Sequence, residues 1–312
     1  MKFIQKTYNE DTKHIEYSIG KLRISRKDKV GLLKAQNKYL TDIINAAMGA
    51  DKIPPAQGEL REWQLELNEF LKAFDKTCRE NNLAYWLDFG TLLGAIRHKG
   101  FIPWDDDVDV SMLKKDIDKL LPILEQSFKN TDFIVRKRAR KANNYQIRLR
   151  HRYYNLGLDI FPVYEYPEEN LTEDLSKTIY DNIIKARKTF TKKFKPQKMT
   201  KEQAVEAINY IQKLQKEIIL PKEEKQMPQN PILFRGIDYK YDEKYLVMPY
   251  DEIFPLNEVE FEGCKFLAPN KTEIYLEKIF GNWKNMPYGV AGAFFHYQNS
   301  YKTAMTDIED EY

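Results

Sequence analysis

The most regular pattern of apolar and polar positions in the chain covers residues 59–82. Apolar residues recur there every three or four positions, which predicts an amphipathic helix with one buried face. Weaker patterns of the same period predict helices at 91–97, 116–128, 201–219 and 272–280, and a further helix after Thr172. Alternating or short apolar runs predict strands at 84–89, 107–112, 133–138, 145–150 and 156–163, and a hairpin at 258–267. Helices and strands are therefore interleaved, as in α/β and α+β folds.

Residues 1–58 follow a different pattern and are predicted to form an N-terminal hairpin and helix arm. Residues 15–24 alternate on both sides of Gly20, which predicts the hairpin, and apolar positions within 30–47 predict a basic helix. This helix either packs on the main domain, forms an oligomer contact, or lies on a membrane with the basic residues of 21–34 facing anionic lipid. The Pro- and Gly-containing stretch 51–58 predicts a linker.

Composition narrows the class of protein. The 312 residues are 42 % hydrophobic, so a sizeable core can form, and the charged residues nearly balance to a net charge of +3, which does not favour nucleic acid as a partner. Of the two cysteines, Cys78 falls on the apolar stripe of the first predicted helix, which indicates a buried thiol. The N-terminus has no apolar run of signal-peptide length and the chain has none long enough to span a membrane, so we expect a cytoplasmic protein.

The spacing of the aspartates indicates a specific chemistry. Asp107 and Asp109 alternate with Val108 and Val110, so a strand would place both carboxylates on one face and both valines on the other. Two adjacent carboxylates repel each other unless a cation neutralises them. Because hard oxygen ligands suit Mg²⁺ or Mn²⁺, the pattern predicts a metal site. If the strand begins earlier, Asp105 joins the same face.

Two further features belong to the same chemistry. Gly90 and Thr91 are predicted at a strand-to-helix turn, where a phosphate can approach the backbone and a helix N-terminus supplies donors. Asp159 interrupts an apolar strand; it pairs with a nearby arginine such as Arg148 or Arg150, or it completes the metal site or takes a proton from an attacking hydroxyl. A turn, an acidic pair and a third acidic strand together favour phosphoryl transfer.

This combination resembles the nucleotidyltransferase superfamily, with Thr91 at a position where that pattern has Gly or Ser. A longer string is more specific: YWLDFGTLLGAIR at 85–97 and GFIPWDDDVD at 100–109 resemble the LicD family, as do shorter matches near Phe261, Ala268 and Phe280. The resemblance covers roughly residues 60–165 and 245–290. It implies a nucleotidyltransferase-type core, a small mixed sheet flanked by helices.

The resemblance also implies an activity. LicD-like proteins transfer phosphocholine from CDP-choline to sugars of lipopolysaccharide, teichoic acid or related glycans, and the fukutin-type relatives transfer ribitol phosphate from CDP-ribitol. The implied site has Asp107, Asp109 and Asp159 as metal-binding and catalytic residues, with CMP as the product. Gly90 and Thr91 would hold phosphate oxygens, and Arg97, Arg148 and Arg150 would neutralise phosphate charge or, in the alternative, be surface charges. Trp104 is one of several tryptophan and tyrosine candidates for contact with a choline ammonium, the alternative being a place in the core. The partners would be a CDP-alcohol donor and an oligo- or polysaccharide acceptor.

Three other functions remain open at this stage. An Asp-x-Asp glycosyltransferase would hold a sugar nucleotide through Mn²⁺, a nucleotidyltransferase would release pyrophosphate, and a glycan-assembly scaffold would have no activity. The first leaves the Gly90-Thr91 turn unexplained, and the last leaves three costly carboxylates unexplained.

The domain organisation follows from both arguments. Residues 1–58 would be the arm, 59–167 the catalytic core, 168–230 a basic helical insertion or lid, and 231–312 the C-terminal part of the LicD-like domain. The implied location is the cytoplasm, including contact with the inner face of the cell membrane.

Overall fold

The computed structural model contains two compact units. One comprises Met1–Ile53 with Lys284–Phe294, and the other comprises Pro54–Trp283 with Phe295–Tyr312. The described residues are 49–127, 157–194, 201–221, 225–236 and 247–285, together with the backbones of 4–9, 14–19, 22–25, 133–140 and 144–151.

The first unit contains a three-stranded antiparallel sheet. Its strands are β1 (Ile4–Asn9), β2 (His14–Ile19) and β3 (Leu22–Ser25), in that order. Ile19 pairs with Leu22, so the hairpin predicted around Gly20 is confirmed, whereas β1 was not predicted. The basic helix predicted within 30–47 lies outside the described residues. A short 3-10 helix, η1 (Ala50–Lys52), follows.

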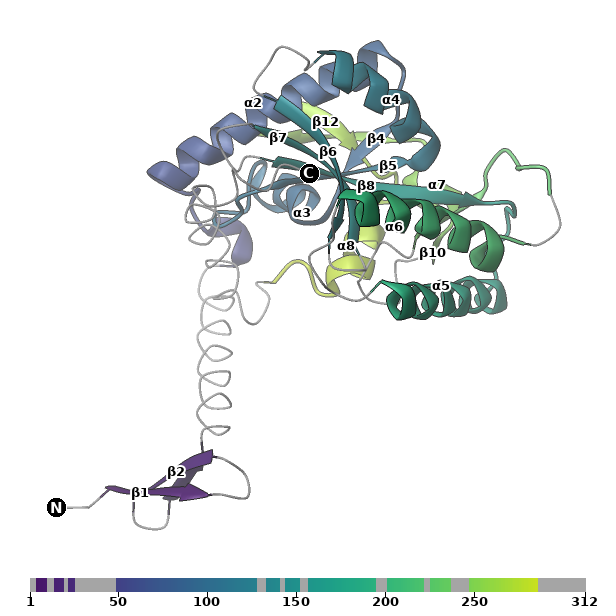
Figure 1. The fold of residues 1–312 in the computed structure, drawn as a ribbon. Coiled ribbons are helices and arrows are strands. Elements are labelled where there is room, and N and C mark those ends of the chain that lie inside the picture. Colours follow the sequence, from purple (N-terminus) through teal and green to yellow (C-terminus); the bar gives the residue numbers. More distant parts are fainter. Residues whose placement is uncertain are drawn as a thin grey trace. The chain divides into compact units, whose positions relative to one another are not determined.

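The second unit is built around a mixed seven-stranded sheet (Figure 1). Its strands are β4 (Tyr85–Leu87), β5 (Val108–Leu113), β6 (Phe133–Arg140), β7 (Asn144–His151), β8 (Gly157–Tyr166), β9 (Ile232–Arg235) and β10 (Val247–Met248). Strand β8 is central: β5 pairs with it in parallel, while β7 and β9 pair with its first and last residues in antiparallel fashion. Strand β4 pairs antiparallel with β5 and ends beside its first residues.

Helices and one hairpin surround this sheet (Figure 1). The helices are α2 (Glu59–Glu80), α3 (Phe89–His98), α4 (Lys114–Ser127), α5 (Glu173–Lys193), α6 (Lys201–Leu214), the π-helical turn η2 (Gln215–Ile219), α7 (Tyr250–Ile253) and α8 (Thr272–Phe280). The hairpin consists of β11 (Asn257–Phe261) and β12 (Cys264–Ala268). The α/β class and every helix and strand predicted after residue 58 are confirmed, with boundary shifts of a few residues.

The apolar stripe of α2 packs against the sheet as its period predicts. Leu67, Leu71, Phe74 and Cys78 are completely buried, and so are Val108 and Val110 of β5. Helix α2 ends at Glu80 with Asn81 as its C-cap, and Asn82 adopts the left-handed conformation that Asn tolerates. At the start of α5 the Thr172 hydroxyl accepts a hydrogen bond from the Leu175 N–H (3.2 Å), as its capping role predicts.

The segment 168–230 is helical and contributes to the same apolar core. Ile179, Ile183 and Phe190 of α5 and Ile211 of α6 are buried in one cluster with residues of the sheet. Its position as a separate insertion stays a prediction. Strands β9 and β10, which follow it, were not predicted from the sequence, because strands of 4 and 2 residues are too short to show an alternating pattern.

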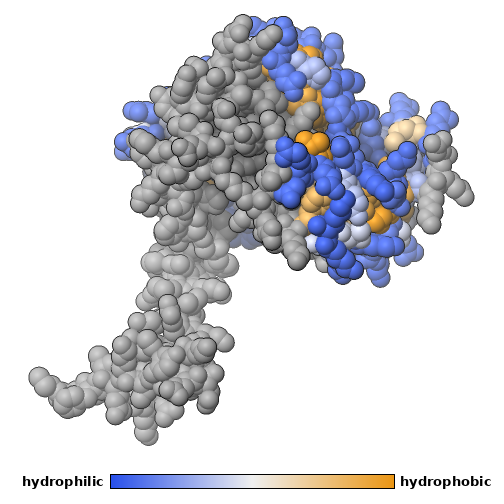
Figure 2. All heavy atoms as spheres, viewed as in Figure 1, coloured by the Kyte–Doolittle hydropathy of each residue, from blue (hydrophilic) through white to orange (hydrophobic). Residues whose placement is uncertain are grey.

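The face drawn in Figure 2 is mainly hydrophilic over its coloured part, with small separate apolar areas. Among the described residues the large apolar side chains that are exposed are Leu65, Val205, Met227, Ile274 and Phe280. Single exposed apolar side chains are common in folded proteins and need no partner. Within the described residues, no helix has both the length and the apolar character needed to cross a membrane.

Candidate active site

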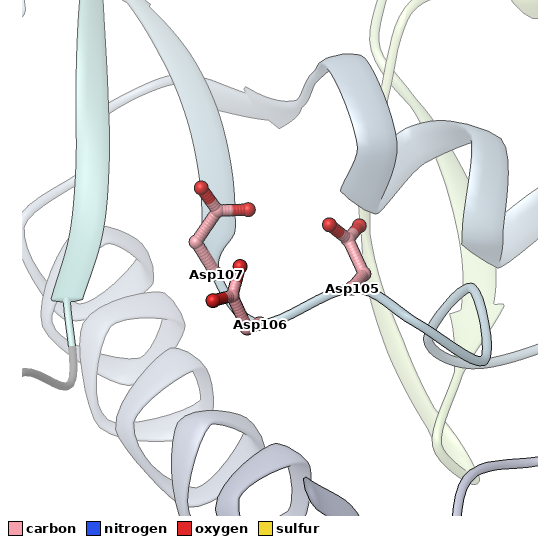
Figure 3. A group of neighbouring side chains, drawn as sticks. All are labelled: Asp105, Asp106 and Asp107. Carbon is pink, nitrogen blue, oxygen red and sulfur yellow. The ribbon is translucent and has the colours of Figure 1, made fainter. Parts of the chain in front are cut away.

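Three consecutive carboxylates gather on the loop before β5. Asp105, Asp106 and Asp107 each offer an oxygen atom, and these atoms lie within 4.8 Å of one another. In Figure 3 the carboxylates of Asp105 and Asp107 point to the same side of the loop. Asp107 was predicted as the first residue of the strand, but β5 begins at Val108, because the backbone turns at Asp105, whose N–H donates to the Ile102 carbonyl (2.9 Å). The earlier turn makes Asp105 and Asp106 members of the acidic cluster.

The electrostatics of this cluster favour a bound cation. Burial, together with the charges of Asp107 and Asp106, raises the pKa of Asp105 well above its usual range. Burial also raises the pKa of Asp109, and Asp107 and Asp159 add to this shift. Like charges in a partly desolvated site make ionisation costly, and a divalent cation removes that cost.

Asp109 and Asp159 occupy facing positions on two parallel strands. They are paired in the register of β5 and β8, and Asp159 is almost completely buried. Arg148 of β7 is the register partner of Asp159 on its other edge, and Arg150 is opposite Gly157. The side chains of both arginines lie outside the described residues, so their roles stay predictions.

The Gly90-Thr91 turn lies directly beside the acidic cluster. Asp88 is the residue before α3, and its carboxylate accepts a hydrogen bond from the Phe89 N–H (2.8 Å). A Cβ atom on Gly90 would be 2.5 Å from an oxygen of Asp105, so only glycine fits there without a shift of that carboxylate. The buried Thr91 hydroxyl accepts a hydrogen bond from the Asp109 N–H (2.9 Å), which joins the turn to β5.

The remaining predicted site residues lie on either side of this turn. Arg97 is in the last turn of α3, where it donates hydrogen bonds to the Trp283 carbonyl (3.3 Å) and to His98 Nε2 (3.0 Å). Trp104 is half-buried on the acidic loop and packs against the apolar core. The structure therefore brings together Gly90, Thr91, Asp107, Asp109 and Asp159, and it gives Arg97 contacts within the protein.

The second turn of α2 also holds the loop of residues 105–107. The Trp63 indole N–H donates to the Asp106 carbonyl (3.0 Å), and the Gln64 amide donates to the Asp105 carbonyl (2.9 Å). Sequence reasoning assigned Trp63 to the apolar stripe and gave Gln64 no role. Gln64 was the available signal, because it is a polar residue beside that stripe. Its side chain is completely buried, and buried polar groups form hydrogen bonds.

A separate pocket of about 820 Å³ lies elsewhere on the second unit. It is lined by residues including Ala84, Glu169, Asn170, Tyr250 and Phe254, and by none of the predicted site residues. Ala84 precedes β4 and Asp88 follows it, so this pocket and the acidic cluster lie toward opposite ends of that strand.

Comparison with known proteins shows that the part of the chain with this site matches a known family. Residues 82–204 match the family described as LicD/FKTN/FKRP, nucleotidyltransferase domain. This segment of the chain is similar to the LicD family. The matched segment contains the turn, the acidic loop and Asp159, so the LicD-family match covers the predicted carboxylates.

Curated proteins resemble shorter parts of the chain. The lipopolysaccharide cholinephosphotransferase LicD of Haemophilus influenzae is 47 % identical over 64 residues, which is 20 % of this chain and 24 % of that protein. The RP689 protein of Rickettsia prowazekii is 36 % identical over 124 residues, or 38 % of each chain. The human ribitol 5-phosphate transferase FKRP is 54 % identical over 33 residues, 11 % of this chain and 7 % of that protein. The chain thus spans well under half the length of these curated relatives.

Proposed function

We propose that this protein transfers an alcohol phosphate, such as phosphocholine, from a CDP-alcohol to a hydroxyl group of a cell-surface glycan, with release of CMP. The observation that carries the proposal is the contact of the Gly90-Thr91 turn with Asp105 and Asp109 in the segment that matches the family. The names of the relatives from Haemophilus influenzae and human, a cholinephosphotransferase and a ribitol 5-phosphate transferase, support an alcohol phosphate as the transferred group.

The donor set of the acidic cluster fits Mg²⁺. Its ligand atoms are carboxylate oxygens, the hard ligands that Mg²⁺ and Mn²⁺ prefer, and their mutual spacing permits one cation to contact several of them. Asp107 and Asp109 would hold the metal, with Asp105, Asp106 and Asp159 as further ligands. When bound, the cation would neutralise diphosphate charge and stabilise the departure of CMP.

The protein residues then have separate tasks. The first N–H groups of an α-helix have no carbonyl partners within the helix, so those of Gly90 and Thr91 at the start of α3 would donate to a bound phosphate. Gly90 leaves room for a phosphate oxygen close to the backbone. Asp159, which is opposite Asp109 in the register and almost completely buried, would accept the proton of the attacking sugar hydroxyl.

The test incubates the protein and Mg²⁺ with CDP-choline, CDP-ribitol or CDP-glycerol and a panel of glycans, and measures CMP release. We expect release with at least one donor. Asp107→Asn keeps the shape of the side chain but removes its charge, so release should fall by about 10²–10³-fold. The same change should abolish the rise in melting temperature that Mg²⁺ causes in the unmodified protein.

Asp118→Asn is the matched control, because Asp118 is an exposed aspartate of α4 paired with Lys114. It should leave both CMP release and the Mg²⁺ effect unchanged. Pyrophosphate as the product would show that the protein transfers the nucleotide instead, and full activity of Asp107→Asn would refute the metal assignment.

A further inference from the structure

A buried carboxylate lies directly beneath the turn. Asp88 is completely buried and accepts hydrogen bonds at both oxygens. Its Oδ1 accepts from the Phe89 N–H (2.8 Å) and the Tyr275 hydroxyl (2.9 Å), and its Oδ2 accepts from the Ser111 hydroxyl and from Nη2 of Arg235. A carboxylate has about four acceptor positions. These donors, from α3, α8, β5 and β9, therefore fix Asp88 in all directions.

Arg235 is the cation of this network. Its side chain is completely buried, its Nη1 donates to the Ser111 hydroxyl (3.1 Å), and its Nη2 also donates to the Tyr275 oxygen. Tyr275 accepts a further hydrogen bond from the Trp86 indole N–H (3.4 Å). A buried guanidinium is costly unless its charge is paired and its donors are bonded, so the placement of Arg235 depends on Asp88 and Asp88 depends on Arg235.

The network holds an unfavourable backbone conformation. Phe89 has a φ of 42°, in the left-handed region that residues with a Cβ atom rarely adopt. Such conformations persist only when surrounding contacts enforce them. The Phe89 ring packs edge-on against Phe161, with centroids 5.0 Å apart, and the Arg235 guanidinium lies 5.1 Å from the ring centroid.

The residues that follow Phe89 are the turn itself. The Asp88 N–H donates to the Asp109 carbonyl (3.0 Å), and Thr91 receives the Asp109 N–H. The backbone of Asp109 is therefore bonded to Asp88 through its carbonyl and to Thr91 through its N–H. A shift of Asp88 would move Phe89 and change the distance between the turn and the acidic strand.

We propose that Arg235 and Tyr275 are positioning residues. Through Asp88 they hold the Phe89–Gly90–Thr91 turn against β5, the strand that carries Asp109. The inference rests on the proposed function, since it assigns the turn and that strand to the donor. Both residues lie outside the segment that matches the family, 82–204, so the match does not assign them a role.

The test compares two variants that each remove one buried hydroxyl and keep the ring. Tyr275→Phe removes the hydrogen bond to Asp88. Tyr85→Phe, the matched control, removes the bond from Tyr85, an equally buried residue of the same core, to Asp75 (2.5 Å). Both should fold and show similar small losses of thermal stability. Tyr275→Phe alone should raise the KM for the donor about tenfold, the loss expected for one hydrogen bond to a charged group, with a smaller change in kcat.

A second readout needs no substrate. Hydrogen exchange of the backbone amides in peptides covering residues 88–92 should be about tenfold faster in Tyr275→Phe and unchanged in Tyr85→Phe. Arg235→Lys keeps the charge but cannot bond Ser111, Asp88 and Tyr275 in the same way, so it should show the same pattern with larger changes.

The outcomes separate the two proposals. If Tyr275→Phe matches Tyr85→Phe in exchange of 88–92, the positioning role is overturned, whatever the activity. If the unmodified protein releases CMP from no donor, the proposed function fails, while faster exchange in Tyr275→Phe still supports the positioning role. Faster exchange with an unchanged donor KM in an active protein would show that the network supports only the fold, and it would also overturn the inference.

Discussion

The absence of a side chain at Gly90 is as much a part of the candidate site as the carboxylates are. A Cβ at this position would be 2.5 Å from an oxygen of Asp105, whereas a Cβ on Gly94, one turn later in α3, would be 2.4 Å from the Gly100 backbone carbonyl. A carboxylate at the end of a side chain can rotate away, but a backbone carbonyl in a packed loop cannot. A side chain at Gly90 should therefore change the geometry of the site, whereas a side chain at Gly94 should lower the stability of the fold.

We expect Gly90→Ala to weaken Mn²⁺ affinity about 10–100-fold, the range for changes that displace a metal ligand indirectly, with little change in melting temperature. Gly94→Ala should instead lower the stability by about 1–3 kcal/mol through overpacking. Calorimetric titration with Mn²⁺ and thermal unfolding measure the two effects. Unchanged Mn²⁺ affinity in a folded Gly90→Ala protein would show that Asp105 does not contribute to the cation site.

Among the elements, the hairpin of β11 and β12 holds the chain that leads from α3 to the acidic loop. Its turn residue Glu262 forms two hydrogen bonds with Arg61 of α2 (2.8 and 2.6 Å) and accepts the Phe101 N–H (3.1 Å). A Cβ on Gly100 would be 2.4 Å from the same carboxylate. Helix α2 and the hairpin thus enclose the segment between α3 and β5.

This contact predicts a pH-dependent contribution to stability. Burial alone would raise the pKa of Glu262, but the hydrogen bonds from Arg61 and the Phe101 N–H outweigh it and lower that pKa. A carboxyl whose pKa is lowered by folding stabilises the protein fully above its unfolded pKa of about 4.3, and this stabilisation is lost as the pH falls through the folded value.

Glu262→Gln should therefore lower the free energy of unfolding at neutral pH by about 1 kcal/mol, because solvent partly screens the pair. The difference from the unmodified protein should shrink below about pH 4.3. Urea unfolding over the acid range measures it, with Glu260→Gln, an exposed glutamate of the same hairpin, as the control. A difference that is independent of pH would contradict an ionic role for Glu262.

For the molecule as a whole, local pattern predicted the elements, while long-range contacts determined the site. The period of α2 and the alternation of Val108 and Val110 are properties of neighbouring residues, so the sequence predicted their burial correctly. Asp105 was placed on the acidic face only if the strand began earlier, and Asp88 received no role. Their importance depends on Gly90, Arg235 and Tyr275, and no short-range pattern shows which residues a fold brings to one carboxylate.

The two cysteines report on this whole-molecule packing. Cys78 is completely buried, and burial raises the pKa of its thiol, while Cys264 is partly exposed. A thiol reagent such as Ellman's reagent should modify one thiol per folded chain rapidly, and the second only when the core unfolds. Cys264→Ser should remove the rapid phase, and a rapid phase that persists in this variant would show that the core around Cys78 opens readily.

Two of the contacts to Asp88 can form only late in the synthesis of the chain. Its partners Arg235 and Tyr275 follow it by 147 and 187 residues, so they are synthesised long after it. A nascent chain exposes the acidic loop and the turn long before the ribosome has made the residues that hold them in place. A translation product that stops before Tyr275 would therefore carry the motif without the contacts that hold it in place.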